Sequence, residues 1–428
     1  MKRSTYILLI LVLIFALYIF FFERKSKSTK EIEEKSDNLF SEFIEEPSEI
    51  ARIGFEDFKI VKEKENYYLK EPFTDPVDTH SVKGFVETFK EAKAERIIKE
   101  KVDLKELGLL EPKIKIIFKS KDQEKFLKIG DVPPYGKGAY FISDNRIGVL
   151  SDLTLETVKR EIDNFRAKEL CFPLNVDEVK ALSYYKNDLL ELSLERKGDE
   201  WLISHPFKDI ADIRNTISLI EDVVLWPIME FEKGENTEDY ELSKGNEKII
   251  LTTTDGNQIT ITIGKLKDEQ KKFYYAKVSS RNGIFVISKN SVRNIDADKN
   301  VFRSLMVFGE SFDKYDEFVV KKGKEIIFKN KDKNFICTDK GIDENSSKTF
   351  IYSLTSLEGY KYLESFDAKE KYAEIELKAK GETKKVSFYE KGEELVSQIQ
   401  GRSGFIQLSK DSSERVKGAF SVIFSKVK

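Results

Sequence analysis

One glycine-rich loop in this chain has residue types that could do chemistry. It spans residues 130–138 and reads GDVPPYGKG. A phosphate-binding loop needs four residues between its glycines and a Ser or Thr after the lysine, which supply amide donors and a magnesium ligand. Here five residues separate Gly130 from Gly136, and Gly138 follows Lys137. We therefore interpret the loop as a connection between strands and predict no nucleotide site.

The histidines and carboxylates give no catalytic pattern. With 2 histidines, His80 and His205, the chain cannot build a three-histidine metal site. A Ser-His-Asp triad would have to use one of them, but both are interpreted as surface or capping residues. The 76 acidic residues are too numerous to single out a pair, so a carboxylate-based hydrolase stays open with nothing in its favour. We predict no catalytic residue, no cofactor and no metal.

Three arginines precede glycine in an Arg-x-Gly pattern, at Arg146, Arg281 and Arg402. Each Arg-x-Gly segment is expected to form a turn that leads into an apolar strand. Two interpretations remain open: the arginines are solvated turn residues, or they form a row that contacts an anionic partner.

A threefold internal repeat places these residues in context. Residues 66–73 (NYYLKEPF) recur as residues 200–207 (EWLISHPF), an offset of 134 (206 − 72). A second step of 134 leads to Phe335, so Tyr67, Trp201 and Phe335 occupy one position and are predicted to anchor three cores. The same offset relates the apolar helix stripe of Phe85, Val86 and Phe89 to two later stripes, the last of which is expected at 354 and 357. The third copy lacks the proline and is degenerate.

Each copy combines hairpin signals with amphipathic helices. Residues 254–257 (TDGN), for example, separate two alternating apolar runs, which is typical of a β-hairpin. Strands in hairpins favour an α+β class with antiparallel sheets over a parallel α/β architecture. We predict repeat 1 at residues 50–173, repeat 2 at 174–309 and repeat 3 at 310–428.

The first residues predict a transmembrane anchor. Residues 4–22 are uncharged, and nineteen residues at about 1.5 Å each span about 28 Å, close to the hydrocarbon thickness of a bilayer. The stretch ends in YIFFF and lacks a small-residue cleavage site, which favours an uncleaved single-pass anchor over a signal peptide. Residues 23–49 are predicted to be a charged spacer. Since Lys2 and Arg3 form a short basic amino terminus, we expect the bulk of the chain on the extracytoplasmic side of a bacterial cytoplasmic membrane.

Composition excludes one class of partner and bears on the cysteines. Lysine and arginine number 73 against 76 acidic residues, with no basic run interleaved with aromatics, so no nucleic-acid binding is predicted. Cys171 and Cys337 lie in apolar strand-like runs and are expected to be buried free thiols.

The repeat unit has a recurring set of motifs. In the first copy these are the aromatic before x-x-x-x-Pro, the amphipathic helix, Leu107-Gly108-Leu109-x-x-Pro112, Ile129-Gly130 and Tyr140, and in the second copy they are Trp201, Pro206, Tyr240, Leu242, Ile263, Gly264 and Tyr274 or Tyr275. With these motifs the unit resembles a family of uncharacterised proteins, the domain of unknown function 4340 family. The resemblance implies an amino-terminal anchor and an envelope accessory role beside gliding-motility-type ABC transporter components, and it brings no catalytic residues.

The anchor, the triplication and the missing catalytic pattern predict a non-enzymatic accessory or scaffold protein. Its expected partners are the lipid bilayer, through residues 4–22, and ABC transporter subunits. An envelope receptor that binds glycan, lipid or peptide between repeats is the alternative.

Overall fold

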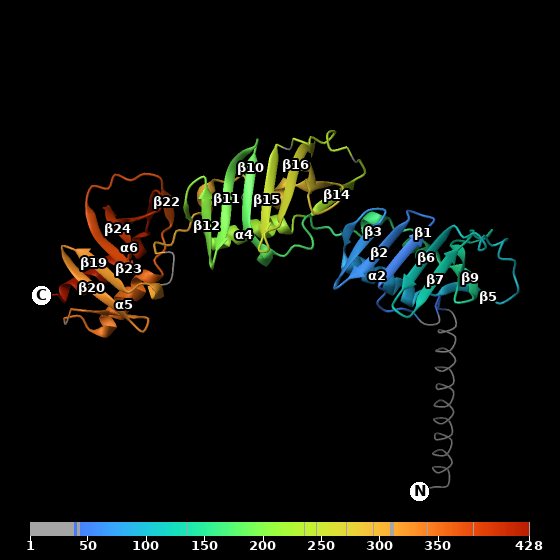
Figure 1. The fold of residues 1–428 in the computed structure, drawn as a ribbon, viewed down its shortest axis with the longest axis horizontal. Helices are drawn as coiled ribbons and strands as arrows, with labels where there is room; N and C mark the ends of the chain where they lie inside the picture. Colours follow the sequence, from blue (N-terminus) through green and yellow to red (C-terminus); the bar gives the residue numbers. More distant parts are fainter. Residues whose placement is uncertain are drawn as a thin grey trace, which may run out of the picture. The chain divides into compact units, whose positions relative to one another are not determined.

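The computed structural model describes residues 38–427 except 41–42, 135, 235, 245, 271, 294, 309–311, 340 and 380. The chain divides into two compact units, Met1–Lys168 and Glu169–Lys428, each described by itself. The described residues form three antiparallel sheets, one in the first unit and two in the second (Figure 1).

Repeat 1 folds into a nine-stranded sheet with strand order β4-β3-β2-β1-β6-β7-β8-β9-β5. Its helices are α2 (Thr79–Glu91) and α3 (Asp152–Val158). The strands are β1 (Glu49–Ile53), β2 (Phe58–Glu63), β3 (Asn66–Glu71), β4 (Asp75–Val77), β5 (Ala94–Ile98), β6 (Ile114–Lys119), β7 (Glu124–Ile129), β8 (Ala139–Ser143) and β9 (Arg146–Leu150).

Repeat 2 folds into a nine-stranded sheet with order β13-β12-β11-β10-β15-β16-β17-β18-β14. Its long helix is α4 (Ile213–Val224), and η3 (Lys289–Ser291) and η4 (Lys299–Phe302) follow the sheet. The strands are β10 (Val179–Lys186), β11 (Leu189–Lys197), β12 (Glu200–His205), β13 (Asp209–Ile210), β14 (Ile228–Glu232), β15 (Glu247–Thr253), β16 (Gln258–Asp268), β17 (Phe273–Val278) and β18 (Ile284–Ser288).

Repeat 3 has eight strands in the order β21-β20-β19-β23-β24-β25-β26-β22. Helices α5 (Glu344–Thr355) and α6 (Lys410–Ser425) pack with this sheet. The strands are β19 (Glu317–Lys322), β20 (Lys324–Lys331), β21 (Asn334–Cys337), β22 (Lys361–Leu363), β23 (Lys371–Ala379), β24 (Glu382–Lys391), β25 (Glu394–Ile399) and β26 (Phe405–Gln407).

The three sheets share one strand order, which confirms the predicted α+β class and the repeated sheet units. The described residues of repeat 3 form no counterpart of β4 and β13. The helix N-cap lies 9 residues after the aromatic strand's last core residue in repeats 1 and 2 (Leu69 to Asp78, Ile203 to Asp212), but 6 residues after it in repeat 3 (Cys337 to Asp343). The three missing residues remove the strand.

The shorter connection before α5 also makes one prediction wrong. A constant offset of 134 placed the third apolar stripe at Leu354 and Leu357, but α5 ends at Thr355. Leu357 is buried beyond the helix, and Phe350 with Leu354 forms the stripe. Helix α5 therefore begins three residues earlier than a constant offset predicts, because the connection before it is three residues shorter.

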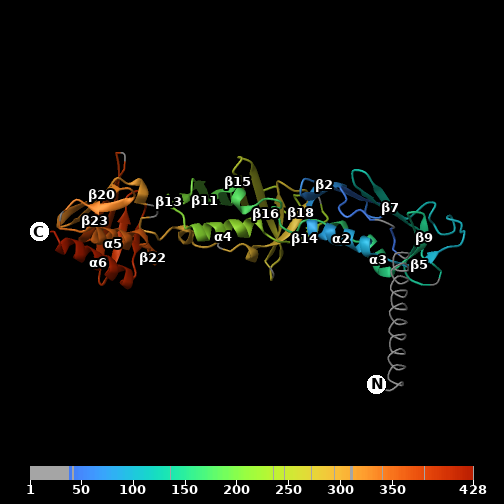
Figure 2. The same cartoon turned by 90° about the horizontal axis from the view of Figure 1, so that it is seen from below.

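The equivalent helices α2, α4 and α5 each begin after an aspartate N-cap, and each covers one face of its sheet. The carboxylate of Asp78 accepts hydrogen bonds from the main-chain N–H groups of His80 and Ser81, at 3.0 and 3.1 Å, and Asp212 and Asp343 cap α4 and α5 in the same way. Figure 2 shows α2 and α4 against their sheets. The predicted stripe of Phe85, Val86 and Phe89 is buried there. The opposite sheet face is therefore left open within the described chain of each repeat.

The three aromatic residues at the repeated position lie in three separate cores. Tyr67, Trp201 and Phe335 are 3%, 3% and 4% exposed, respectively. Each aromatic residue pairs with the equivalent residue of the preceding strand in its own sheet. The three positions are therefore equivalent in the structure as well as in the sequence.

The glycine-rich loop connects β7 to β8, and Gly130 allows a close approach of two chain segments. A Cβ atom on Gly130 would lie 2.2 Å from the carbonyl oxygen of Leu107, which accepts a hydrogen bond from the Asp131 N–H at 2.9 Å. Gly264 has the same relation to Tyr240, also at 2.2 Å. The glycine shared by the two copies is thus a steric requirement.

The predicted anchor, residues 4–22, and residues 23–37 of the predicted spacer lie outside the described residues. Within the described ranges, no helix is long and apolar enough to cross a membrane. Leu39, Phe40 and Ile44 are buried in the first core, so this core begins before residue 50, where the sequence placed its start.

Candidate functional site

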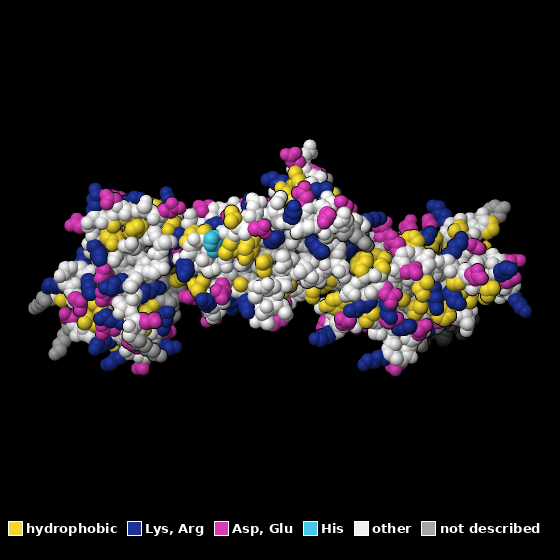
Figure 3. Space-filling view, turned by 45° about the horizontal axis from the view of Figure 1, so that its top comes forward, with side chains coloured by type: hydrophobic (Ala, Val, Ile, Leu, Met, Phe, Trp, Pro, Cys, Tyr) yellow, Lys and Arg dark blue, Asp and Glu magenta, His cyan; other side chains and the backbone are white. Residues whose placement is uncertain are grey.

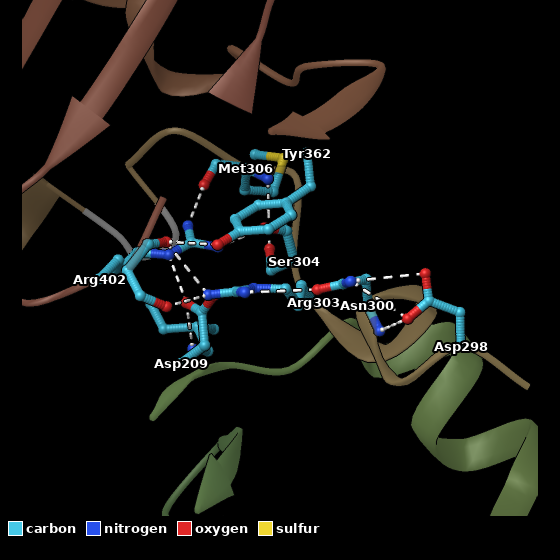
Figure 4. Close-up of polar contacts among 10 residues, drawn as sticks. Asp209, Asp298, Asn300, Arg303, Ser304, Met306, Tyr362 and Arg402 are labelled. Carbon is cyan, nitrogen blue, oxygen red and sulfur yellow. Dashed lines mark hydrogen bonds and ion pairs between the residues drawn. The ribbon is translucent and has the colours of Figure 1, made fainter. Parts of the chain in front are cut away.

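Arg402, one of the three arginines considered for partner contact, lies where repeat 3 meets repeat 2 (Figure 4). Its Nε donates to the carboxylate of Asp209. Its Nη1 donates to the main-chain oxygen of Met306 at 2.9 Å, and its Nη2 donates to that of Ser304. All three contacts are within the chain.

A second arginine, Arg303, binds the same carboxylate. Its Nε donates to Asp209 at 2.6 Å, and its Nη2 donates to the Ser403 hydroxyl at 2.6 Å. The guanidinium lies between two rings, 3.9 Å from the centroid of Phe207 and 3.7 Å from that of Tyr362. Since Phe207 belongs to repeat 2 and Tyr362 to repeat 3, the stack joins the two repeats.

Main-chain pairing positions Asp209 and Arg303. Strand β13 pairs with β12 on one side, and the segment after η4 lies along its other side, where the Ser304 N–H donates to Ile210 at 2.9 Å. The junction is almost dry: the side chains of Asp209, Arg303 and Arg402 are 0%, 2% and 7% exposed. One buried carboxylate pairs with both guanidinium groups, one from each repeat, so it holds repeat 3 against repeat 2.

Repeat 1 contains the same pair. Arg166 Nε donates to Asp75 at 2.7 Å, and its guanidinium lies 5.0 Å from the Phe73 ring centroid. The side chain of Asp75 is 0% exposed and that of Arg166 is 6% exposed. The described part of repeat 3 carries no such pair, because the connection that would hold it is shorter.

All three predicted arginines share one contact. Nη1 of Arg146, Arg281 and Arg402 donates to a main-chain oxygen of the segment that enters the same repeat, at Asn38, Glu169 and Met306, with distances of 2.7, 2.7 and 2.9 Å. Each of these segments forms a β-bridge with the residues before the edge strand. The repeated arginine therefore clamps the entry segment onto its own sheet.

Arg146 differs from its counterparts in local structure. It is the first residue of β9, so the prediction that it lies in a turn is wrong. Asp144 and Asn145 form the turn, with φ values of 46° and 62°, since a two-residue hairpin loop requires left-handed conformations there. Arg281 and Arg402 precede their strands, as expected.

The Asp–Arg pairs were not identified from the sequence, although the sequence contains a signal for them. Both copies continue from Pro-Phe to x-Asp, as PFTD at 72–75 and PFKD at 206–209. A buried acidic position repeated next to a repeated aromatic indicates a paired charge. Its partners lie 91 and 94 residues later, so only the fold reveals them.

A second polar cluster lies inside repeat 2. The Tyr184 hydroxyl donates to Glu247 at 2.8 Å, and Lys289 bridges Glu247 and Asp296 at 2.9 and 3.0 Å. Burial, followed by the hydrogen bond to Glu247, raises the pKa of Tyr184 above its ordinary value. Burial also lowers the pKa of Lys299, whose ammonium is 5.4 Å from the Tyr184 ring. Shifted pKa values of this kind occur in active sites and in structural ion-pair networks alike.

Repeat comparison favours the structural role for this cluster. Tyr184 occupies the register position of Arg52 in repeat 1 and Val320 in repeat 3. Arg52 is fully buried, and its Nη1 donates to the main-chain oxygens of Val158 and Arg160 at 2.8 and 2.6 Å, at the end of α3. Burial lowers the pKa of Arg52 to about 10. Three unrelated side chains thus fill one space beneath the segment that follows the sheet.

The remaining candidate residues lie apart from one another. His80 is exposed in the first turn of α2, and His205 is half-buried at the end of β12. Cys171 and Cys337 are free and buried, as predicted, and burial raises the pKa of the Cys171 thiol to about 12 although the nearby charge of Arg281 acts in the opposite direction. Among the residues that the structure describes, no three His, Cys, Asp or Glu side chains are grouped to hold a metal ion.

Residues 68–225 match the family described as Domain of unknown function (DUF4340), which confirms the predicted family resemblance over this part of the chain. The match runs from β3 of repeat 1 to the residue that follows α4 in repeat 2. It is shorter than the resemblance read from the sequence, which extended over roughly residues 50 to 310. No curated protein and no solved structure matches the chain.

Proposed function

We propose that this protein is a membrane-anchored extracytoplasmic accessory or scaffold protein, associated with an ABC-type transporter complex and without catalytic activity of its own. The observation that carries the proposal is the use of the repeated polar residues. The arginine common to the three repeats binds the main chain of the segment that enters its repeat, and the Asp–Arg pairs lie inside the protein.

A chain that repeats a domain and uses its shared residues for assembly gains length and surface. The junction of repeats 2 and 3 supports this reading, because its buried charges and stacked rings hold one repeat against the next. An active site retained in triplicate would instead show reactive groups at the repeated positions, whereas these positions hold core aromatics, glycines and clamped arginines.

The location rests on the sequence. Residues 4–22 have the length and apolar character of a bilayer span, and the spacer after them is charged. The link to an ABC-type transporter follows from the family resemblance alone. These two elements make the bacterial cytoplasmic membrane, with the repeats outside, the proposed site of action.

The receptor alternative receives less support. It requires a groove between repeats, and at the junction of repeats 2 and 3 the guanidinium of Arg303 already fills the space between Phe207 and Tyr362. The hydrolase alternative has no further observation in its favour.

A pull-down tests the proposal. The tagged full-length chain and a version lacking residues 1–25 are purified in mild detergent, and copurifying proteins are identified by mass spectrometry. Transporter subunits retained by the anchored form and lost from the truncated form would support the proposal. Absence of any membrane protein from both forms would contradict it.

A further inference from the structure

The open sheet face of repeat 1, opposite α2, carries a row of apolar side chains across its strands. The row consists of Val61 on β2, Ile117 on β6, Phe126 on β7 and Ile142 on β8, and it is oblique to the strand register, because Val61 pairs with Glu49 of β1, which lies opposite Lys119, and Ile142 pairs with Lys128. Ile117 and Phe126 are directly paired, and Phe126 is 36% exposed. Ile53 of β1, 50% exposed, stands beside the row opposite Lys115. We call these five residues and the lysines between them the open face.

The same register positions in the other repeats are mostly polar, which provides an internal comparison. Strand pairing equates the row Val61, Ile117, Phe126, Ile142 with Glu195, Ile250, Thr260, Lys277 in repeat 2 and with Lys329, Glu376, Lys385, Gln398 in repeat 3. The sheet therefore folds with polar residues at each position. The apolar row of repeat 1 is not required by the architecture, so it calls for another explanation.

Two lysines on the open face stand directly opposite each other. Lys115 of β6 pairs in register with Lys128 of β7, and like charges in this arrangement repel. Their ammonium groups are 5.9 and 5.6 Å from the centroid of the Phe126 ring, and among the described residues no carboxylate lies within ion-pair distance of either.

In the other repeats the equivalent pair carries no such repulsion. Lys248 of repeat 2 stands opposite Thr262 and binds Asp188 at 3.0 Å. Glu374 of repeat 3 stands opposite Ser387, whose hydroxyl donates to it at 3.2 Å. Only repeat 1 combines two facing cations with an apolar row, which is the complement of a surface that is both apolar and acidic.

We propose that the open face of repeat 1 binds an amphipathic helix of a partner protein, with apolar residues against the row and acidic residues against Lys115 and Lys128. The row crosses four strand spacings, about 19 Å, and shifts by four residues, about 13 Å, along the strands, so its ends are about 23 Å apart. A helix of about 16 residues covers this length. Figure 3 shows hydrophobic side chains among Lys and Arg side chains on the part formed by repeat 1, at the right of the view.

The proposal deepens the proposed function and rests on it, since it names the kind of partner that the scaffold holds. A purely electrostatic contact would leave the apolar row exposed. A purely apolar contact would leave the two facing lysines without anions. An acidic amphipathic segment satisfies both halves of the surface at once.

The probe is a labelled helical peptide of about 16 residues, the length that spans the row, with Leu on one face and Glu on the other, and its counterpart has Lys in place of Glu. Binding to the detergent-solubilised full-length chain is followed by fluorescence anisotropy. The F126T/K128T variant introduces the residues that repeat 2 has at the same positions, Thr260 and Thr262. Circular dichroism checks that the variant folds, and K115T is a second variant at the same pair.

The Glu peptide is expected to bind the native chain at least about tenfold more tightly than the Lys peptide. F126T/K128T and K115T should each weaken it by about tenfold or more, whereas T260A/T262A, the matched control in repeat 2, should leave it unchanged. Equal binding of the two peptides, no binding of the Glu peptide, or full binding to F126T/K128T would each overturn the proposal.

The pull-down separates this inference from the proposed function. A transporter subunit retained equally by the native chain and by F126T/K128T would contradict the open-face proposal and leave the scaffold role standing. If the native chain retains no membrane protein, the scaffold role fails, and the peptide titration still decides whether the open face binds an acidic helix.

Discussion

Replacing Asp209 by Asn should destabilise the second unit by about 3 kcal/mol. The side chain of Asp209 is 0% exposed and holds the guanidinium groups of Arg303 and Arg402. Asn has nearly the same shape, so the change removes the charge and leaves two buried cations facing a neutral amide. Loss of one partner of a buried ion pair typically costs about 3–5 kcal/mol, and the remaining amide oxygen places the expectation near the lower end.

The assay uses tryptophan fluorescence during thermal and urea unfolding of the full-length chain. Both tryptophans of the chain, Trp201 and Trp226, are buried in repeat 2, so the signal reports on the unit that contains the junction. A loss of about 3 kcal/mol corresponds to a midpoint lowered by about 6 to 12 °C. The matched control is Asp188→Asn, whose carboxylate is 80% exposed and pairs with Lys248 on the surface; its midpoint should not change.

A double-mutant cycle checks the reasoning further. Arg402→Gln removes one of the two cations and leaves Asp209 paired with Arg303. Because the double variant Asp209→Asn/Arg402→Gln no longer buries two unpaired cations, it should lose less stability than the sum of the single changes, by about 0.5–3 kcal/mol. Equal midpoints for Asp209→Asn and Asp188→Asn, or strict additivity in the cycle, would refute the view that this carboxylate holds the junction.

Three further predictions follow from single residues. Because burial raises the pKa of Cys171 to about 12, the native protein should react with an aromatic disulfide reagent at pH 8 about a thousandfold more slowly than the unfolded chain; comparable rates would contradict the buried thiol. Gly130→Ala should destabilise repeat 1, since its Cβ would lie 2.2 Å from a carbonyl oxygen, whereas Gly84→Ala, in the open middle of α2, should stabilise it by about 0.5–1 kcal/mol; circular dichroism melts compare the two. Burial raises the pKa of Asp296, but the hydrogen bond and charge of Lys289 outweigh it and lower the pKa overall. This carboxylate therefore stabilises the fold above the ordinary Asp pKa, and the stabilisation is lost as the pH falls through the lowered value, so Asp296→Asn should flatten the acid side of the pH–stability curve.

The repeat could be predicted because its signals are local. The aromatic strand, the Pro-Phe pair and the helix stripe of Phe85 and Phe89 recur at a constant offset in the first two copies, and hairpin chemistry indicated antiparallel strands. The offset failed where three residues are missing before α5, because periodicity cannot reveal a deletion between two elements. Leu357 was consequently placed one turn too far along a helix that ends at Thr355.

The junction could not be predicted for a different reason. Asp209 and Arg303 lie 94 residues apart, and Arg402 lies 193 residues from Asp209. Among 73 basic and 76 acidic residues, no sequence pattern selects these partners. Burial alone distinguishes them from ordinary surface charges, and burial depends on how the repeats pack.

The measurement that tests the central claim most directly is membrane extraction combined with protease access. Membranes containing the full-length chain are washed with alkaline carbonate, and intact spheroplasts are treated with protease. The account predicts that the full-length chain stays in the membrane, that a chain lacking residues 1–25 is released, and that external protease digests the repeats. Release of the full-length chain by carbonate, or protection of its repeats until the cells are lysed, would contradict an extracytoplasmic anchored scaffold.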